Sequence, residues 1–381
     1  MSWVSLLKRL VPPAIRYRLD WLLRPLWALP RGVLILLGER PRGKTPHIFY
    51  GHGKIPNPED QTYGGMVKFQ HMQEEFPNSP SGFNILYMVS SRMPYGGQQI
   101  AWFARKKGAR VVWNQNGVAY PGWYGPGWER INAPMARIHT EADYVFYQSE
   151  FCRRSAEQFL GERRERWEIL HNAVDTQVFT PSGADPAPGS MVMLLGGTQY
   201  QWYRLESALQ TLARLRQQGG NARLLVTGRL CWISDEAGTA RQAHELIGRL
   251  GLDADVQFLG TYTQTNAPSI FRQAHLLIHT KVNDPCPGLV VEAMACGLPV
   301  VYSHSGGVPE LVGEEAGVGV PGELNWERDV PPDPDALAQA VLKVMERRDA
   351  YSKAARQRAV DRFDLKPWME RHRQVFDAVL R

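Results

Sequence analysis

The chain has 381 residues, 44% of them hydrophobic, and this length and composition indicate two or three folded domains. The net charge of +6 is concentrated at the start, because residues 1–32 carry six basic side chains and one acid. A nucleic-acid-binding body would carry its positive charge on a folded face, so this distribution argues against a nucleic-acid partner. No apolar segment approaches the roughly 20 residues that span a bilayer. The four cysteines are widely spaced, and we expect free thiols.

The first segment, residues 1–44, is predicted to be a basic amphipathic arm. Its apolar side chains share one helical face, and tryptophans add rings that favour the headgroup region. We predict a peripheral membrane contact through residues 1–32, drawn by anionic lipid, with the rest of the chain in the cytoplasm at the inner face of the membrane. Packing of this helix on its own domain or on a second subunit is the alternative that stays open.

From residue 46 strands and helices alternate, with strands expected at 47–50, 83–89 and 110–113 and helices at 66–76 and 98–107. Gly64 and Gly65 precede a helix, where glycine permits close backbone approach to a ligand. Asn116 follows the third strand; its amide can donate and accept hydrogen bonds but cannot act as a base. The aromatic residues at 120–128 either form a stacking wall for a ligand or tie down their own loop.

A strand at 142–146 leads to a helix for which Ser149 is the expected N-cap. Residues 182–190 have the composition of a linker, after which the pattern restarts with strands at 191–195, 223–226 and 256–260 and a helix at 203–217. Asp253 and Asp255 are interpreted as an exposed turn and Asp333 as the cap of a helix at 336–346. No spacing suits zinc, so we expect no metal. A last helix is predicted at 368–380.

The most informative stretch is 276–310, in which a buried strand, a turn rich in Asp, Pro and Gly, a short helix at 289–296 and a second strand follow one another. Doubly wound sheets bind ligands where their strands end. The N–H groups of Gly288, Leu289 and Val290 at the start of the helix suit a phosphate. Asp284 and Glu292 bracket this turn. Either acid alone is explained by the turn or the helix dipole, whereas the pair indicates a site.

Asp284 and Glu292 are separated by seven residues, and the segments AMACGLPVV and GGVPELVG follow them. This pattern resembles the signature of the retaining glycosyltransferases of the GT-B fold, family 4. The resemblance implies an α/β protein with two Rossmann-like domains facing across a cleft. Residues 45–185 are then the acceptor-side domain, 190–360 the donor-side domain, and 361–381 a helix that crosses back to the first domain. Three departures are Asp284 for the usual Glu, Asn116 where many members have His, and Thr198 where Arg is usual.

The resemblance also implies an activity: a hexosyltransferase-type enzyme that moves a sugar from a nucleotide-sugar donor to a glycan or lipid-linked acceptor, with retention, in polysaccharide or lipopolysaccharide synthesis. No metal or other cofactor is expected. It places Asp284 and Asn116 near the reacting sugar, Glu292 near the ribose, and Gly64 and Gly65 near the donor phosphates. Three cations are candidates for the diphosphate, and the choice among them stays open: Arg204, Arg229 and Lys281. A nucleotide-sugar 2-epimerase and a scaffold without turnover are the alternative functions.

Overall fold

The structure is a computed structural model that describes residues 29–381 except 42, 63, 183–185, 187 and 188. Most of the predicted membrane-binding arm, residues 1–28, therefore lies outside the described residues. Residues 29–37 are helical and pack on α4 (Gly97–Lys106) through the buried Ile35. Lys107 donates from Nζ to the carbonyl oxygens of Ile35 and Gly38 and so closes the end of this helix. Within the described part of the chain, no helix has the length and apolarity to cross a membrane.

The first domain is built on a parallel sheet whose strands follow one another in chain order: β1 (Ile48–Phe49), β2 (Ile85–Val89), β3 (Arg110–Gln115), β4 (Tyr144–Tyr147) and β5 (Trp167–Ile169). Its central strands β2 and β3 are almost wholly buried because helices cover both faces. The helices of this domain are α3 (Gly65–Met72), η1 (Ser90–Arg92), α4, α5 (Pro121–Tyr124), α6 (Trp128–Glu141) and α7 (Glu150–Phe159).

The second domain holds a parallel sheet in the order β11-β10-β9-β6-β7-β8. Its strands are β6 (Met191–Leu195), β7 (Ala222–Thr227), β8 (Val256–Gly260), β9 (Leu276–His279), β10 (Val300–His304) and β11 (Gly317–Pro321). The helices that cover it are α8 (Trp202–Gln217), α9 (Glu236–Leu250), α10 (Ala267–Phe271), α11 (Gly288–Ala295), α12 (Val308–Val312) and α13 (Pro334–Glu346). The strand order reverses between β6 and β9, and a doubly wound sheet opens a ligand crevice at that point.

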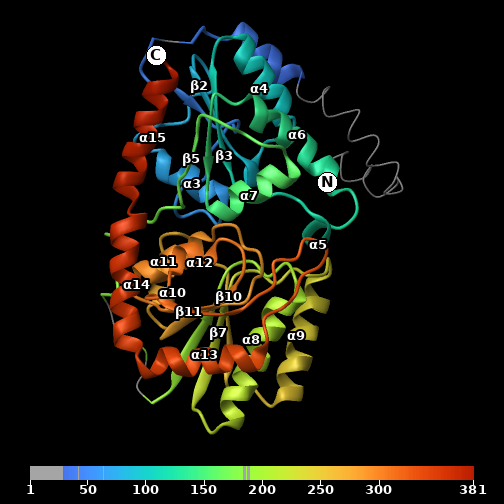
Figure 1. Ribbon diagram of the computed structural model, residues 1–381, viewed down its shortest axis with the longest axis vertical. Coiled ribbons are helices and arrows are strands. Elements are labelled where there is room, and N and C mark those ends of the chain that lie inside the picture. Colours follow the sequence, from blue (N-terminus) through green and yellow to red (C-terminus); the bar gives the residue numbers. More distant parts are fainter. Residues whose placement is uncertain (1–28, 42, 63, 183–185, 187–188) are drawn as a thin grey trace.

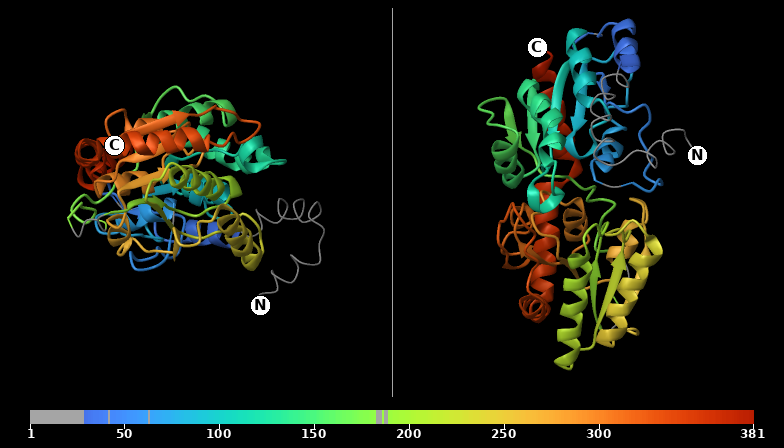
Figure 2. Two further views of the ribbon diagram at one scale, coloured as in Figure 1. Left: turned by 90° about the horizontal axis from the view of Figure 1, so that it is seen from below. Right: turned by 90° about the vertical axis from the view of Figure 1, so that its right-hand side faces the viewer.

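The two domains lie one above the other, and α14 (Arg348–Phe363) and α15 (Leu365–Val379) run along one side of both (Figures 1 and 2). Phe363 at the end of α14 belongs to a core of the second domain, whereas Trp368 and Phe376 of α15 pack on the first sheet. At the junction, Val174 donates to Phe363 O (2.9 Å) and accepts from Leu365 N (3.0 Å). The predicted return of the last helix to the first domain is confirmed, and the two connections between the domains are paired there.

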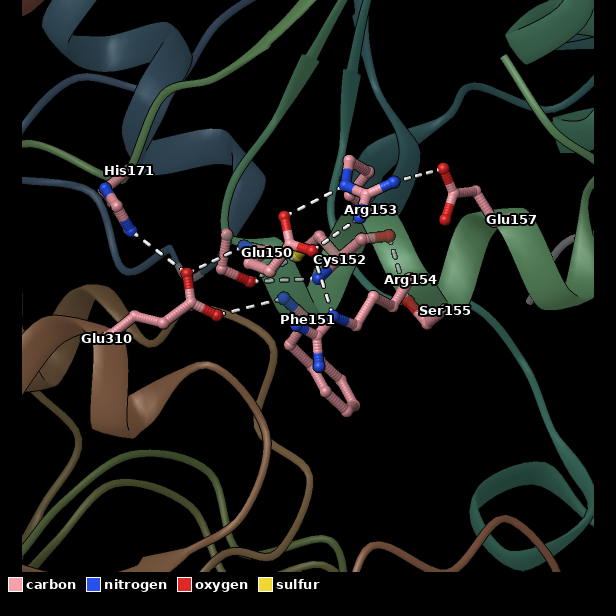
Figure 3. A network of polar contacts seen from close by, with 10 residues as sticks. Glu150, Phe151, Cys152, Arg153, Arg154, Ser155, Glu157, His171 and Glu310 are labelled. Carbon is pink, nitrogen blue, oxygen red and sulfur yellow. Dashed lines mark hydrogen bonds and ion pairs between the residues drawn. The ribbon is translucent and has the colours of Figure 1, made fainter. Parts of the chain in front are cut away.

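A second junction joins the start of α7 to the other domain (Figure 3). The Glu310 carboxylate on α12 accepts from the backbone N–H groups of Glu150 (2.7 Å) and Phe151 (3.0 Å). Ser149 is the N-cap that the sequence predicts, since its Oγ accepts from Cys152 N (3.0 Å), and the same hydroxyl donates to Pro285 O (2.6 Å). The amino end of a first-domain helix is thus held by an acid and a carbonyl of the second domain.

A third junction is aromatic. The segment between β11 and α13 carries Trp326, whose ring lies 4.8 Å from that of Tyr120, 5.4 Å from Phe151 and 5.2 Å from Phe159. Gly122 N also donates to Trp326 O (2.7 Å). This partly buried second-domain tryptophan therefore packs against a first-domain core, and its contacts limit how far the two domains can separate.

Candidate functional site in the interdomain cleft

A cleft of about 940 Å³ lies between the domains and includes the loops that follow β6 and β9, the strands at the reversal of the second sheet. The structure brings into this cleft every predicted site residue except Val290. These lining residues are Asp284, Glu292, Asn116, Gly64, Gly65, Thr198, Arg204, Arg229, Lys281, Gly288 and Leu289. Gly64 and Glu292, 228 positions apart in the sequence, thus share one cavity, as the switch-point argument predicts.

The amino end of α11 opens onto this cleft. Pro287 is the N-cap residue, and no side chain caps the helix there. Gly288 and Leu289 line the cavity, so the positive end of the helix dipole is presented to a ligand. Val290 differs: its side chain is fully buried in the core and its N–H donates to Pro287 O (3.1 Å). That bond disfavours the predicted phosphate contact at Val290.

The Asp284 carboxylate is fixed in place by two neighbouring side chains. It is 8% exposed, accepts from His279 Nε2 (3.1 Å) at one oxygen and from Lys281 Nζ (2.9 Å) at the other. Burial alone would raise the pKa of Asp284, but Lys281 and the hydrogen bond from His279 outweigh it and hold that pKa far below its usual value. Asp284 therefore stays ionised and is a poor proton acceptor. Gly306 and Gly307 allow this position, since a Cβ on either would lie within 2.6 Å of the Asp284–Pro285 backbone.

Glu292, in contrast to Asp284, is buried without a cationic neighbour among the described residues. It is 7% exposed, and one oxygen accepts from Gln264 Nε2 (3.1 Å). Burial raises the pKa of Glu292 to about 7, because this single neutral hydrogen bond replaces little of the lost hydration. The two acids that flank the start of α11 thus have very different protonation behaviour, set by the presence or absence of a cationic neighbour.

The cations of the second domain occupy distinct positions around the cleft. Arg204 is 5% exposed; its Nη1 donates to Thr198 O (2.5 Å), while its buried Nε has no hydrogen-bond partner among the described residues. Lys281, besides pairing with Asp284, lies 5.4 Å from the ring centre of Trp123 on the first domain. Arg229 also lines the cleft, next to a close approach of the two glycine loops at Gly197 and Gly228. Arg204 therefore has an unused donor at this wall.

On the first domain, Asn116 is fixed by local contacts. Its N–H donates to Ser90 Oγ (2.8 Å), and its Oδ1 accepts from Gly117 N (2.7 Å). Gly117 approaches Pro285 of the other domain so closely that a Cβ would lie 2.7 Å from that ring. The role of Asn116 toward a bound sugar stays a prediction, with its Nδ2 donors as the groups to perform it.

The aromatic stretch at 120–128 divides between the two interpretations of the sequence. Tyr120 is buried beside Trp326, and Trp128 packs on Phe159 (5.2 Å between ring centres). Trp123 and Tyr124, in contrast, are 38% and 43% exposed and line the cleft. Two rings therefore tie down the segment and two are presented to a ligand.

Sequence reasoning missed two groups of this site, His279 and Lys68. His279 ends β9 and orients Asp284, and burial lowers its pKa, which leaves it neutral. Lys68, on α3, is 6% exposed and donates from Nζ to Asn114 Oδ1 (3.2 Å) and to Asn172 Oδ1. The available signal was a lysine among the apolar positions of a helix that follows Gly64 and Gly65.

No group of three or more His, Cys, Asp or Glu side chains is arranged to hold a metal in the part of the chain that the structure describes. Asp255, one of the two aspartates interpreted as an exposed turn, forms an ion pair with Arg216 (3.0 Å). The absence of a metal requirement stays a prediction.

Comparison with known protein families identifies the family of the second domain. Residues 189–359, which contain the whole of the second sheet, match the family model of glycosyl transferases group 1. The second domain is thus a glycosyl transferases group 1 domain. The predicted family is thereby confirmed.

Solved structures agree on the fold. The chain is similar to HepE of Anabaena in complex with UDP, with a TM-score of 0.62, 19% identity and coverage of 82% of this chain and 80% of that one. Sucrose-phosphate synthase of Thermosynechococcus elongatus gives a TM-score of 0.64 at 18% identity, covering 82% and 76%. The arrangement of two Rossmann-like domains is the GT-B fold, which confirms the predicted fold class.

Curated relatives match a part of the chain. The D-inositol 3-phosphate glycosyltransferase of Salinispora arenicola is 29% identical over 166 residues, which are 39% of this chain and 37% of that protein. The enzyme of the same name from Mycolicibacterium smegmatis is 26% identical over 215 residues, 54% of this chain and 46% of the relative. The chain thus aligns with less than half the length of each of these two relatives.

Proposed function

We propose that the protein transfers a sugar from a nucleotide-sugar donor to a glycan or lipid-linked acceptor with retention of configuration, in the synthesis of cell-surface polysaccharide or lipopolysaccharide. One observation carries the proposal: Asp284 and Glu292 flank the uncapped start of α11 at the reversal of the second sheet, in a domain of the glycosyl transferases group 1 family. HepE was solved with UDP and with UDP-glucose, which makes UDP-sugars the first donors to test here.

The chemistry follows from the charges around the cleft. Departure of a nucleoside diphosphate builds negative charge on phosphate oxygens, and fixed donors lower that barrier. The N–H groups of Gly288 and Leu289, with Arg204, Arg229 and Lys281, would supply that stabilisation. Retention requires the acceptor hydroxyl to attack from the face that the diphosphate leaves, with its proton passing to the departing phosphate. Asp284 would act by holding Lys281 and His279 in place, because its low pKa makes it a weak base.

The acceptor side is the wall formed by Trp123 and Tyr124, whose exposed rings suit stacking on a sugar. A contact of residues 1–32 with the inner face of the cytoplasmic membrane would bring a lipid-linked acceptor to this wall, and it remains part of the proposal. The exposed acceptor wall favours transfer over the 2-epimerase alternative, which needs no second substrate.

The test is a donor screen. UDP-, GDP- and ADP-sugars are ranked by thermal shift, and the best donor is then incubated with a glycan acceptor mixture and analysed by mass spectrometry. We expect one nucleotide to stabilise the protein and a glycosylated product to form. The variant with Asp284→Ala and Glu292→Ala should form none, whereas the control Asp253→Ala should be fully active. An epimerised donor, or binding without product, would replace the proposal by one of the two alternatives.

A further inference from the structure

The charge of the cleft is divided between its two walls. Among the described residues that line it, both acids, Asp284 and Glu292, belong to the second domain. The first domain contributes Lys68 and Arg92 and neither an aspartate nor a glutamate. With two cations and no acid among its described residues, this wall favours a ligand that carries negative charge.

The distribution of acids between the two walls does not explain why Lys68 is buried here. Its ammonium is buried and is bonded to two neutral amide oxygens, those of Asn114 and Asn172. No carboxylate of the described residues forms an ion pair with its Nζ, and the nearby thiols of Cys286 and Cys152 are neutral because burial raises their pKa values. Buried charges are normally paired, because hydration is lost and must be replaced. A lysine kept in a cleft without a counter-charge is therefore expected to receive one from a ligand.

The surroundings of Lys68 add donors rather than acceptors. Lys68 lies in the first turn of α3, whose start has no side-chain cap and no acid. A Cβ on Gly65 would lie 2.9 Å from Ser91 Oγ and 3.0 Å from Arg92 Cγ, so η1 adjoins this helix start. Trp368 also lines the cleft, is 4% exposed, and its indole N–H has no hydrogen-bond partner within the described residues. All of these groups attract negative charge.

We propose that the acceptor is anionic and that its phosphate or diphosphate binds the first-domain wall at Lys68 and Arg92. This inference rests on the proposed function and names the class of its second substrate. The phosphate of a sugar phosphate and that of a polyprenyl-linked glycan present the same chemistry, and both fit the charge of this wall. The position of Lys68 also links the two substrates, since Asn172 donates from Nδ2 to Cys286 O (2.5 Å), two residues from Asp284.

The experiment measures acceptor affinity by calorimetry on the full chain, saturated with UDP so that the donor subsite is filled. One arm compares glucose 6-phosphate with glucose, and the other compares polyprenyl phosphate with polyprenol in detergent micelles. We expect the phosphorylated member to bind more tightly than its neutral counterpart in at least one arm, which also identifies the source of the phosphate. Lys68→Met and Arg92→Gln should each weaken that binding on the order of 30-fold.

The controls separate charge from folding. Lys68→Arg should retain most of the affinity, and Lys343→Met, on the exposed side of α13, should retain all of it. Equal binding of phosphorylated and neutral ligands in both arms would overturn the inference. So would a Lys68→Met variant that weakens UDP as much as the phosphorylated acceptor, because that pattern indicates a damaged cleft. A wild-type chain that binds no nucleotide would instead refute the proposed function, before any acceptor is added.

Discussion

Replacing Glu292 by glutamine tests the electrostatics of the site through stability. The folded chain raises the pKa of this carboxyl from 4.5 to about 7, whereas unfolding restores the ordinary value. Below pH 4.5 the group is protonated in both states and burial is tolerated. Between pH 4.5 and about 7 the folded state keeps a proton that the unfolded state has released, so stability falls with rising pH, and the loss is complete once the folded state also ionises above about 7.

The size of this loss follows from the shift. A displacement of two to three pKa units corresponds to about 3 kcal/mol at pH 8. Glutamine keeps an oxygen that can accept from Gln264 and carries no charge. Glu292→Gln should therefore be more stable than the wild type by up to about 3 kcal/mol at pH 8, with the difference vanishing near pH 4.5.

The assay is urea denaturation followed by circular dichroism at pH 4.5, 6, 7 and 8. Glu245→Gln, an exposed site on α9, is the matched control and should follow the wild type. The same Glu292→Gln variant should lose about tenfold or more in kcat/KM, because a charged hydrogen-bond acceptor for the nucleotide is gone. Parallel stability curves for wild type and variant would refute the assignment of a buried, unpaired carboxyl.

Three further perturbations address the contacts around the cleft. Lys281→Met leaves Asp284 buried with one partner and should cost about 3 kcal/mol in urea denaturation at pH 7, most of it recovered when Asp284→Asn is added; equal stability of single and double variants would speak against the pair. Trp326→Ala should destabilise the protein by about 3 kcal/mol and increase the radius of gyration in small-angle scattering, and an unchanged radius would show that this tryptophan does not restrain the domains. Glu310→Gln weakens the acid that caps α7 and should lower stability by about 1 kcal/mol, measured by thermal unfolding, with Glu314→Gln as the unaffected control.

Periodicity predicted the sheets well because buried parallel strands are continuous apolar runs. The strand expected at 256–260 is β8 with the same bounds, and the strand–turn–helix at 276–296 is β9 and α11 within one residue at each end. Other elements were missed for identifiable reasons. The helix expected at 66–76 ends at Met72, and α14 was not predicted, since the buried positions on it include the small Ala355 and Ala359 rather than a stripe of large apolar side chains. α6 was also missed; it contains Pro134, which normally interrupts a helix.

The site residues, too, fall into those that the sequence could predict and those that it could not. Asp284, Glu292 and Gly288 lie in one short segment, so their shared position could be inferred from local order along the chain. Lys68 meets Asn172, 104 residues further on, and such a contact depends on the packing of whole elements. The pairing of Asp284 with both His279 and Lys281 is local in sequence, but nothing in the spacing indicates that the three side chains converge. The domain boundaries and the roles of individual site residues stay predictions.

The central claim is that a leaving diphosphate rests at the amino end of α11 with one acid on each side. Crystals soaked with UDP measure this directly. We predict that the phosphate oxygens will lie within hydrogen-bond distance of the Gly288 and Leu289 N–H groups, with the ribose hydroxyls at Glu292. Phosphates bound elsewhere in the cleft, with this helix end unoccupied, would contradict the claim.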